Sequence, residues 1–369
     1  MKRLVLAGGG HAHVEVLRRF GLAPAQDVEV VLISPDRYTA YSGMLPGLVA
    51  GHYTFQQSHI DLDPLARFAR ASLVHDLVVG LDPEARVLTC DSGLTVSYDL
   101  VSLDIGAAPT RLLQGKHADV GIPVKPVGVY LAQWDQVLQA ARQRPLDVVV
   151  VGGGAGGVEI TLAMQHRLSQ LAPRASVGFT IASMSDAILP GHAARVRAAM
   201  ERTLAERGVR LRLGARVERV EGEHVVLQSG ERLQADRVFW AVGAQASDWL
   251  AAAGLATDSG GFVLVDETLQ SVSHPDVFAA GDVATMKDHP RPKSGVYAVR
   301  QGPPLADNLR RRLAGHKLEP YFPQPRALNL ISTGDKYAIA SWGPLCVAGA
   351  WVWRWKDHID RKFMLRYQF

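Results

Sequence analysis

Two glycine-rich stretches decide the fold: Arg3-Leu4-Val5-Leu6-Ala7-Gly8-Gly9-Gly10-His11-Ala12-His13 and Asp147-Val148-Val149-Val150-Val151-Gly152-Gly153-Gly154-Ala155-Gly156-Gly157. In each, an apolar run leads into the glycines, and a segment with helical periodicity follows. A buried strand, a tight glycine turn and a helix N-terminus form the diphosphate cradle of a Rossmann unit. Two such units predict an α/β protein with two Rossmann-like domains that hold two dinucleotides face to face.

The composition is that of a globular protein. Of the 369 residues, 47% are hydrophobic and 21% charged, and the net charge of +4 is too small to indicate a nucleic-acid partner. The two cysteines, Cys90 and Cys346, cannot form a disulfide framework and fit a reducing compartment. We expect no signal peptide, and no apolar run reaches the ~20 residues that span a bilayer, which favours a cytoplasmic location.

The first glycine loop lacks one residue of the usual fingerprint. Gly8 permits the tight turn, Gly10 lets the backbone approach the diphosphate, and the predicted helix Ala12–Phe20 directs its positive end at the anion. His13 stands where the third glycine is usual, so we expect the helix to lie slightly further from the strand. His11 is expected to pack locally or to contact the phosphate.

The residue that would bind the adenosine ribose is also changed. The next strand is predicted over Val28–Ile33, and an acidic residue at its end would bind the ribose. Ser34 occupies that place, with Asp36 two residues later. A serine hydroxyl makes the same hydrogen bond more weakly than a carboxylate.

The second loop keeps all three fingerprint glycines, Gly152, Gly154 and Gly157. The following strand is predicted over Val177–Ile181 and ends at Ser183. A carboxylate there would select NADH and a nearby arginine would accept the phosphate of NADPH, but neither is clear from the sequence. The choice between the two donors stays open.

Three further segments complete an ordered set of motifs. In the segment 276–282 an apolar strand leads into Gly281-Asp282, and we expect a helix to begin near Val283. The other two segments are 98–106, which ends at Gly106, and 236–244, which contains Gly243. Together with the two loops they resemble the two-dinucleotide-binding flavoprotein family, that is, proteins like the pyridine nucleotide-disulfide oxidoreductases. The resemblance implies FAD at the first loop, with the Asp282 carboxylate on the ribityl chain, and NADH or NADPH at the second. Gly106 and Gly243 mark the crossings between the two domains, where Asp104 and Trp240 replace small residues.

This resemblance implies a discontinuous FAD-binding domain, residues 1–120 and 244–330, with an inserted NAD(P)-binding domain, 121–243, and a C-terminal interface segment, 331–369. Four phrases narrow it further to the type II NADH dehydrogenase-like flavoproteins that are sometimes fused to selenide, water dikinase. These phrases are Gly8–Phe20, Tyr41–Tyr53, Ser273–Asp282 and Ser332–Ala340.

The resemblance also assigns candidate roles near the flavin. Glu159 would lie where flavin and nicotinamide meet, or would be a structural carboxylate in the first turn of a helix. Lys125 would lie at the flavin edge, or would be a solvated linker residue. Gln301 would lie at the quinone end of the flavin, or would bond to the backbone inside a core helix that the following prolines kink or restart. Pro46 would press on the ring system.

The implied activity is hydride transfer from NADH or NADPH to FAD and electron transfer to a quinone-like or other small acceptor. No cysteine pair and no histidine pair with metal-ligand spacing is present, so we expect neither a disulfide relay nor a metal site. Cys90 is interpreted as a packing residue on a strand. Two alternatives stay open: a soluble reductase that serves a protein or a selenium or sulfur compound, and a non-catalytic flavin-binding partner.

The C-terminal residues 351–369 combine aromatic side chains with basic ones, including Lys356, against Asp357 and Asp360. On a helix, the apolar residues of this segment recur every four positions and would form one stripe; they are Trp351, Trp355, Ile359, Phe363 and Tyr367. This pattern fits a helix on a membrane surface, a helix that closes over the flavin domain, or a dimer contact.

Overall fold

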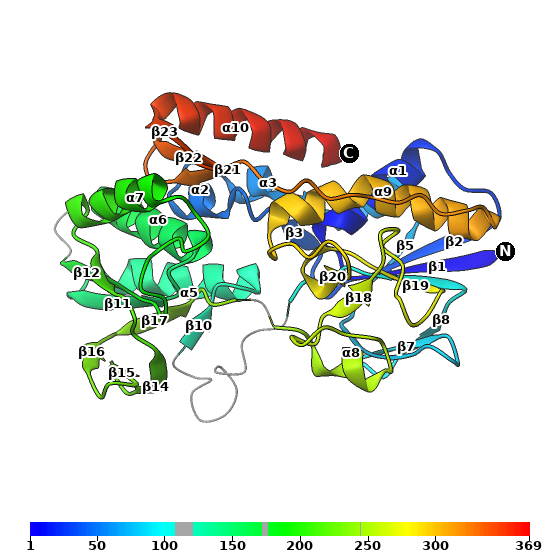
Figure 1. Ribbon diagram of the computed structural model, residues 1–369, viewed down its shortest axis with the longest axis horizontal. Helices are drawn as coiled ribbons and strands as arrows, with labels where there is room; N and C mark the ends of the chain where they lie inside the picture. Colours follow the sequence, from blue (N-terminus) through cyan, green and yellow to red (C-terminus); the bar gives the residue numbers. More distant parts are fainter. Residues whose placement is uncertain (108–120, 172–175, 244) are drawn as a thin grey trace.

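The computed structural model describes residues 1–107, 121–171, 176–243 and 245–369 (Figure 1). Its first sheet is parallel throughout and has the strand order β19-β9-β1-β2-β5. The bounds are β1 Lys2–Ala7, β2 Val28–Ile33, β5 Ser72–Val74, β9 Leu100–Leu103 and β19 Val277–Ala279. Helices α1, His11–Leu22, and α9, Gly295–Ala314, pack against each other beside this sheet, and α4 is Leu62–Phe68.

The second sheet repeats this plan with the order β10-β17-β11-β12-β13, again all parallel. Its strands are β10 Gly121–Pro123, β11 Leu146–Val151, β12 Val177–Ala182, β13 Arg210–Arg212 and β17 Arg237–Trp240. The helices of this half are α5 Val127–Ala140, α6 Ala155–Leu171 and α7 Ala194–Glu206. An antiparallel sheet is attached to it: β14 Val217–Glu221, β15 His224–Leu227 and β16 Arg232–Gln234.

Each predicted glycine loop follows the central strand of its sheet. The apolar runs that precede the loops, Leu4–Ala7 and 148–151, are buried because helices cover parallel sheets on both faces. On each central strand the chain order of the neighbouring strands reverses, and ligands of such sheets bind at this switch point, beyond the carboxyl ends of the strands. The fold therefore presents two equivalent sites, one in each half.

Smaller elements surround the first sheet. The strands among them are β3 Tyr38–Ala40, β4 His59–Asp61, β6 Val78–Asp82, β7 Val87–Cys90, β8 Thr95–Ser97, β18 Val263–Val265 and β20 Ala284–Met286. The short helices are α2 Leu45–Val49, α3 Phe55–Ser58, α8 Asp248–Ala252 and the 3-10 turn η2 Gly281–Val283.

Two expectations about the region after Asp282 were wrong. No long helix begins near Val283, because β20 follows η2 and pairs in parallel with β18. The helix starts at Gly295 instead, and it runs without a break through Pro303 and Pro304. Prolines have no backbone N–H, so the turns at Pro303 and Pro304 lack hydrogen bonds. Close packing of this helix against α1 stabilises these turns: a Cβ on Gly302 would lie 2.7 Å from the Cβ of Glu15.

The C-terminal segment forms an antiparallel sheet and a helix that bridge the two halves. Its strands are β21 Asn329–Ser332, β22 Ala338–Trp342 and β23 Leu345–Gly349, followed by α10 Ala350–Met364 and the 3-10 turn η3 Leu365–Tyr367. The sheet contacts α6 and α7 of the second half. Helix α10 extends from there toward α1 (Figure 1), where the hydroxyl of Tyr367 donates a hydrogen bond to Glu15 at 2.9 Å.

The predicted apolar stripe of this helix is not one face. Trp351, Trp355 and Ile359 are exposed, whereas Phe363 and Tyr367 are buried on the first half. Because a helix turns about 100° per residue, each four-residue step advances about 40° past a full turn. The stripe therefore winds from the solvent side onto the buried side, and its second part packs on the protein itself.

Candidate functional site

The first glycine loop forms a tight turn around residue 104. Gly8 has φ +93°, and a Cβ there would lie 2.4 Å from the carbonyl oxygen of Asp104. A Cβ on Gly10 would lie 2.3 Å from the carboxyl group of the same residue. Only glycine fits either position, and Gly10 places the N-terminus of α1 directly over the end of β9.

Sequence reasoning did not identify Asp104 as a site residue. Its Oδ2 accepts hydrogen bonds from the backbone N–H groups of Ala12, at 2.8 Å, and His13, at 3.1 Å, and the residue is 3% exposed. Burial raises the pKa of Asp104 to about 7, although both backbone hydrogen bonds lower it, and the nearby charge of Asp282 adds to the rise. The only signal in the sequence was an acid in place of a small residue.

His13 explains why the third glycine is dispensable. Its ring nitrogens lie 2.6 Å from the carbonyl oxygen of Gly8 and 2.8 Å from the hydroxyl of Ser102, so the ring fills the space between α1 and the ends of β1 and β9. Burial lowers the pKa of His13 to about 4. The side chain is therefore neutral at pH 7 and serves packing.

Three predicted site residues from distant segments meet beside the loop. The Lys125 ammonium lies 2.9 Å from a carboxylate oxygen of Asp282. His11 is next to both, and its Nε2 is buried without a hydrogen-bond partner. Burial, assisted by the charge of Lys125, lowers the pKa of His11 to about 4, so this ring is neutral at pH 7. An unpartnered buried nitrogen indicates room for a further polar group.

Gln301 bonds to the backbone. Its side-chain carbonyl accepts a hydrogen bond from the N–H of Gly281 at 2.7 Å, and the residue is 7% exposed. This contact fixes the start of η2 against α9, which was the structural alternative considered for Gln301.

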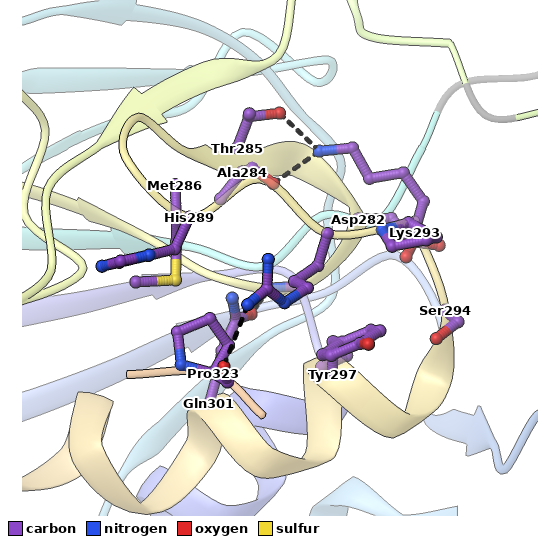
Figure 2. Close-up of a pocket in the computed structure, with 14 residues that line it drawn as sticks. Asp282, Ala284, Thr285, Met286, His289, Lys293, Ser294, Tyr297, Gln301 and Pro323 are labelled. Atoms are coloured by element: carbon purple, nitrogen blue, oxygen red, sulfur yellow. Dashed lines mark hydrogen bonds between the residues drawn. The ribbon is translucent and has the colours of Figure 1, made fainter. Parts of the chain in front are cut away.

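A pocket lies beside these residues, between η2, β20 and α9 (Figure 2). Figure 2 shows Lys293 reaching across it, with its ammonium bonded to Thr285 at 2.8 Å and to the carbonyl of Ala284. Burial lowers the pKa of Lys293 to about 8.

Two other predicted residues, Ser34 and Pro46, occupy defined places. The hydroxyl of Ser34, which is buried, donates to the carbonyl of Asp36 at 3.0 Å. Pro46 lies in α2 and lines a second pocket, together with Trp353 and Lys356 of α10.

The second glycine loop combines two closed positions with two open ones. A Cβ on Gly152, which has φ +127°, would lie 2.3 Å from the carbonyl oxygen of Ala241, and one on Gly157 would lie 2.0 Å from that of Gly152. In contrast, no atom would lie within 4 Å of a Cβ on Gly154 or Gly156. The loop is thus closed toward the sheet and open in front of α6.

Two further predicted residues lie in this half. Ser183 is buried, and its hydroxyl oxygen accepts a hydrogen bond from the backbone N–H of Ser185. The space around Gly243 is open.

Glu159 ties the second half to the C-terminal sheet. Its Oε1 accepts hydrogen bonds from the backbone N–H of Ser332, at 2.8 Å, and from its hydroxyl, at 3.0 Å. Burial raises the pKa of Glu159; the charge of Lys356 and the bonds from Ser332 oppose the rise, and Asp360 adds to it.

Lys356 and Asp360 of the C-terminal helix form a largely buried ion pair. Their charged groups are 2.6 Å apart, and their side chains are 12% and 6% exposed. Both side chains lie on the side of α10 that faces the protein. The apolar residues that recur every four positions in the sequence did not indicate this orientation.

The residues present fit two dinucleotides. At the first loop the space in front of Gly106 is open and His11 lacks a partner; at the second the helix start is open at Gly154. One feature departs from this fit: Asp104 already occupies two N–H groups of α1. Within the described part of the chain, no three or more His, Cys, Asp or Glu side chains are grouped so as to hold a metal ion.

Comparisons with known proteins agree with this geometry. The chain is 32% identical over 220 residues to an NADH dehydrogenase-like protein of Mycobacterium tuberculosis. The aligned segment covers 57% of this chain and 54% of that protein. It is 24% identical over 347 residues to the NADH dehydrogenase-like protein YutJ of Bacillus subtilis, covering 92% and 91%. The chain thus spans about half the length of the mycobacterial relative and nearly all of the Bacillus one.

Among solved structures, the sulfide:quinone oxidoreductase of Aquifex aeolicus matches all of this chain and 91% of its own, with a TM-score of 0.83 and 19% identity. This likeness confirms the predicted α/β fold with two dinucleotide-binding domains. The family model described as pyridine nucleotide-disulphide oxidoreductase matches residues 2–302. The chain therefore belongs to the pyridine nucleotide-disulphide oxidoreductase family, and this membership implies FAD and NAD(P)H as its cofactors.

Proposed function

We propose that this protein is an FAD-dependent oxidoreductase that takes hydride from NADH or NADPH and passes electrons to a quinone-like or other small acceptor. The observation that carries the proposal is the contact between Lys125 and Asp282. Lys125 follows β10 of the second sheet and Asp282 follows β19 of the first, so the contact lies where the two glycine-loop halves meet.

The first half would hold FAD. Gly8 and Gly10 bring the backbone of α1 close to the diphosphate, Gly281 starts η2 beside it, and the Asp282 carboxylate would accept hydrogen bonds from the ribityl hydroxyls. Bound FAD supplies a two-electron carrier that accepts hydride from a nicotinamide. The protein contributes orientation and exclusion of water, for which Pro46 and α10 form the cover on one side.

The second half would bind the hydride donor. Gly154 leaves the start of α6 open to a diphosphate, and Glu159 follows just after the first turn of α6, held by Ser332. We assign Glu159 to positioning the nicotinamide, with Lys356 and Asp360 as the charged groups behind it. Ser183 carries no charge that would distinguish NADH from NADPH.

The acceptor would be reduced without a redox-active disulfide. Cys90 is a buried free thiol in β7, and Cys346 is a free thiol in β23, a separate sheet. Several relatives carry acceptor names, among them a type II NADH:quinone oxidoreductase of Haemophilus influenzae, 26% identical over 155 residues, and a rubredoxin-NAD(+) reductase of Pseudomonas putida, 28% identical over 305. The alternatives are thus a quinone-like molecule and a soluble acceptor, which includes a redox protein or a selenium or sulfur compound.

Anaerobic reduction tests the proposal. The purified full-length protein is expected to show a flavin spectrum, and NADH or NADPH is expected to bleach it. A short-chain quinone should then restore the absorbance faster than rubredoxin or a selenium or sulfur compound does. If neither nucleotide bleaches the bound flavin, the enzymatic function is wrong, and the non-catalytic flavin-binding alternative applies.

We further propose that this protein contacts a membrane surface peripherally. An apolar face, formed by exposed side chains of β22, β23 and the outer side of α10, comprises Trp342, Leu345, Val347, Trp351, Trp355 and Ile359, each 39–56% exposed. Exposed Arg354, Lys362 and Arg366 lie on the same helix or just beyond it, which suits anionic headgroups. No helix of the described residues combines the length and apolar character needed to cross a bilayer.

Removal of two indoles from this face should weaken membrane binding. The double substitution Trp351→Ser and Trp355→Ser is expected to lower binding to vesicles of phosphatidylglycerol and phosphatidylethanolamine about 30-fold in a flotation assay, because each indole loses roughly 1 kcal/mol of burial. Phe322→Ser, which removes an exposed aromatic outside this face, is the control. Equal flotation of all three proteins would reject the membrane contact, and a concentration-dependent dimer that the double substitution disrupts would assign the face to a second copy.

A further inference from the structure

Asp104 and the FAD diphosphate would compete for the same backbone groups. The anion-binding capacity of a helix start lies in the unpaired N–H groups of its first turn. In α1 two of these groups, those of Ala12 and His13, already donate to the Asp104 carboxylate. A diphosphate bound at the start of α1 would therefore find fewer free N–H groups and would lie next to the negative charge of Asp104.

The carboxylate is held firmly in the middle of the cradle. A Cβ on Gly10 would lie 2.3 Å from Asp104, and a Cβ on Gly281, on the opposite side, would lie 2.4 Å from its Oδ1. The loop and η2 thus approach the carboxyl group so closely that both need glycine. Asp104 therefore cannot move aside without displacement of one of these backbones.

The second half shows the same place without an acid. Ala241 follows β17 as Asp104 follows β9, and its carbonyl oxygen would lie 2.3 Å from a Cβ on Gly152, as that of Asp104 would lie 2.4 Å from one on Gly8. The residue at this position is thus Ala241 in the second half, where the start of α6 is open. It is Asp104 in the first half, where its carboxylate occupies N–H groups at the start of α1. The acid is a specific feature of the first site.

Among the residues that the structure describes around Asp104, no unpaired cation offsets its charge. From α1 it faces His11 and His13, whose pKa values burial lowers to about 4, so that both are neutral at pH 7. From η2 it faces Asp282, whose carboxylate is paired with Lys125, and α9 contributes only the neutral amide of Gln301. An ionised Asp104 next to a bound diphosphate would leave adjacent negative charges in a buried site.

We propose that FAD binds to the form of the protein in which Asp104 carries a proton, so that FAD binding at alkaline pH takes up one proton from the solvent. This inference rests on the assignment of FAD to the first glycine loop. A protonated carboxyl group carries no net charge and can itself donate a hydrogen bond, so it turns from a competing anion into a neutral neighbour of the diphosphate.

The direction of the pH dependence follows from linkage. Burial raises the pKa of Asp104 to about 7 before FAD binds, and a bound anion raises it further. Below pH 7 the proton is already present, so the dissociation constant of FAD is insensitive to Asp104. Above pH 7 the proton must be taken up, and the dissociation constant rises by about tenfold per pH unit until the pKa of the complex is reached.

The test compares full-length flavoproteins diluted at pH 6 to 9, with the fluorescence of released FAD as the readout. The wild-type dissociation constant should rise about tenfold per unit above pH 7, whereas that of Asp104→Asn should stay constant within about twofold over the same range. Asparagine keeps an acceptor for the N–H groups of α1, and Asp104→Ala reproduces the alanine of the second half. Asp99→Asn, just before the start of β9, removes the same charge at the other end of the strand and should behave as wild type.

Calorimetry gives an independent readout. Titration of FAD into flavin-free protein at pH 8, in two buffers of different ionisation enthalpy, should show uptake of close to one proton by the wild type and of none by Asp104→Asn. A flat wild-type profile, or a tenfold rise per pH unit in Asp104→Asn and Asp104→Ala like that of the wild type, would overturn the role of Asp104. If no variant and no wild-type sample binds FAD at any pH, the flavin assignment itself fails instead.

Discussion

Substitution of Gly157 by alanine is expected to slow flavin reduction by NADH or NADPH about 100-fold while FAD stays bound. The new Cβ would lie 2.0 Å from the carbonyl oxygen of Gly152 and 3.3 Å from the Cβ of Ala241. The first of these atoms belongs to the backbone at the end of β11, so α6 must move away from the sheet. A shift of about 1 Å in a binding element can cost 100-fold in rate, and the overpacking should lower the free energy of unfolding by about 1–3 kcal/mol.

The neighbouring glycine provides a matched control. Gly156→Ala adds the same methyl group one residue earlier, where no atom lies within 4 Å, and alanine in a helix is about 1 kcal/mol more favourable than glycine. Stopped-flow absorbance at the flavin band gives the reduction rate, and thermal unfolding gives the stability. Reduction of Gly157→Ala at the wild-type rate would contradict donor binding at this loop, and loss of FAD from this variant would show that the closed turn serves both halves.

The sequence predicted the parts of the fold that depend on short segments. A buried strand, a turn that needs φ above zero and a helix start lie within about fifteen consecutive residues in each half, and the structure has Gly8 at φ +93° and Gly152 at φ +127°. Resemblance then placed Lys125 and Asp282 at one site, and they lie 2.9 Å apart. The catalytic and binding roles given to these residues stay predictions.

Contacts between distant segments were the parts that the sequence could not supply. Asp104 lies 91 and 92 positions from its two donors, and its importance depends on how closely α1 approaches the end of β9. The burial of Lys356 and Asp360 could not be predicted, because a four-residue spacing does not show which side of a helix meets the protein. In the same way, β20 forms after Val283 only because a partner strand, β18, lies beside it.

Loss of most of the bound FAD is the expected result of Asp282→Ala. Asp282 lies in η2, with its side chain 13% exposed, and is the acidic group that the family resemblance places on the ribityl hydroxyls. Hydrogen bonds to a charged group contribute about 1.5–3 kcal/mol each, so loss of one should weaken FAD binding about 10- to 150-fold. Removal of the charge also relieves repulsion of the diphosphate and of Asp104, which works in the opposite direction.

We expect the lost hydrogen bond to dominate, because the charge of Asp282 is already compensated by Lys125 at 2.9 Å. The ratio of flavin to protein absorbance in purified samples, and the fluorescence of FAD released on dilution, measure the effect. Asp282→Asn keeps an acceptor and should retain more FAD than Asp282→Ala, while Asp288→Asn, which removes the same charge from an exposed position six residues later, should retain all of it. If Asp282→Ala holds FAD as tightly as the wild type, the carboxylate does not bind the ribityl chain, and its contact with Lys125 serves only to join the two halves.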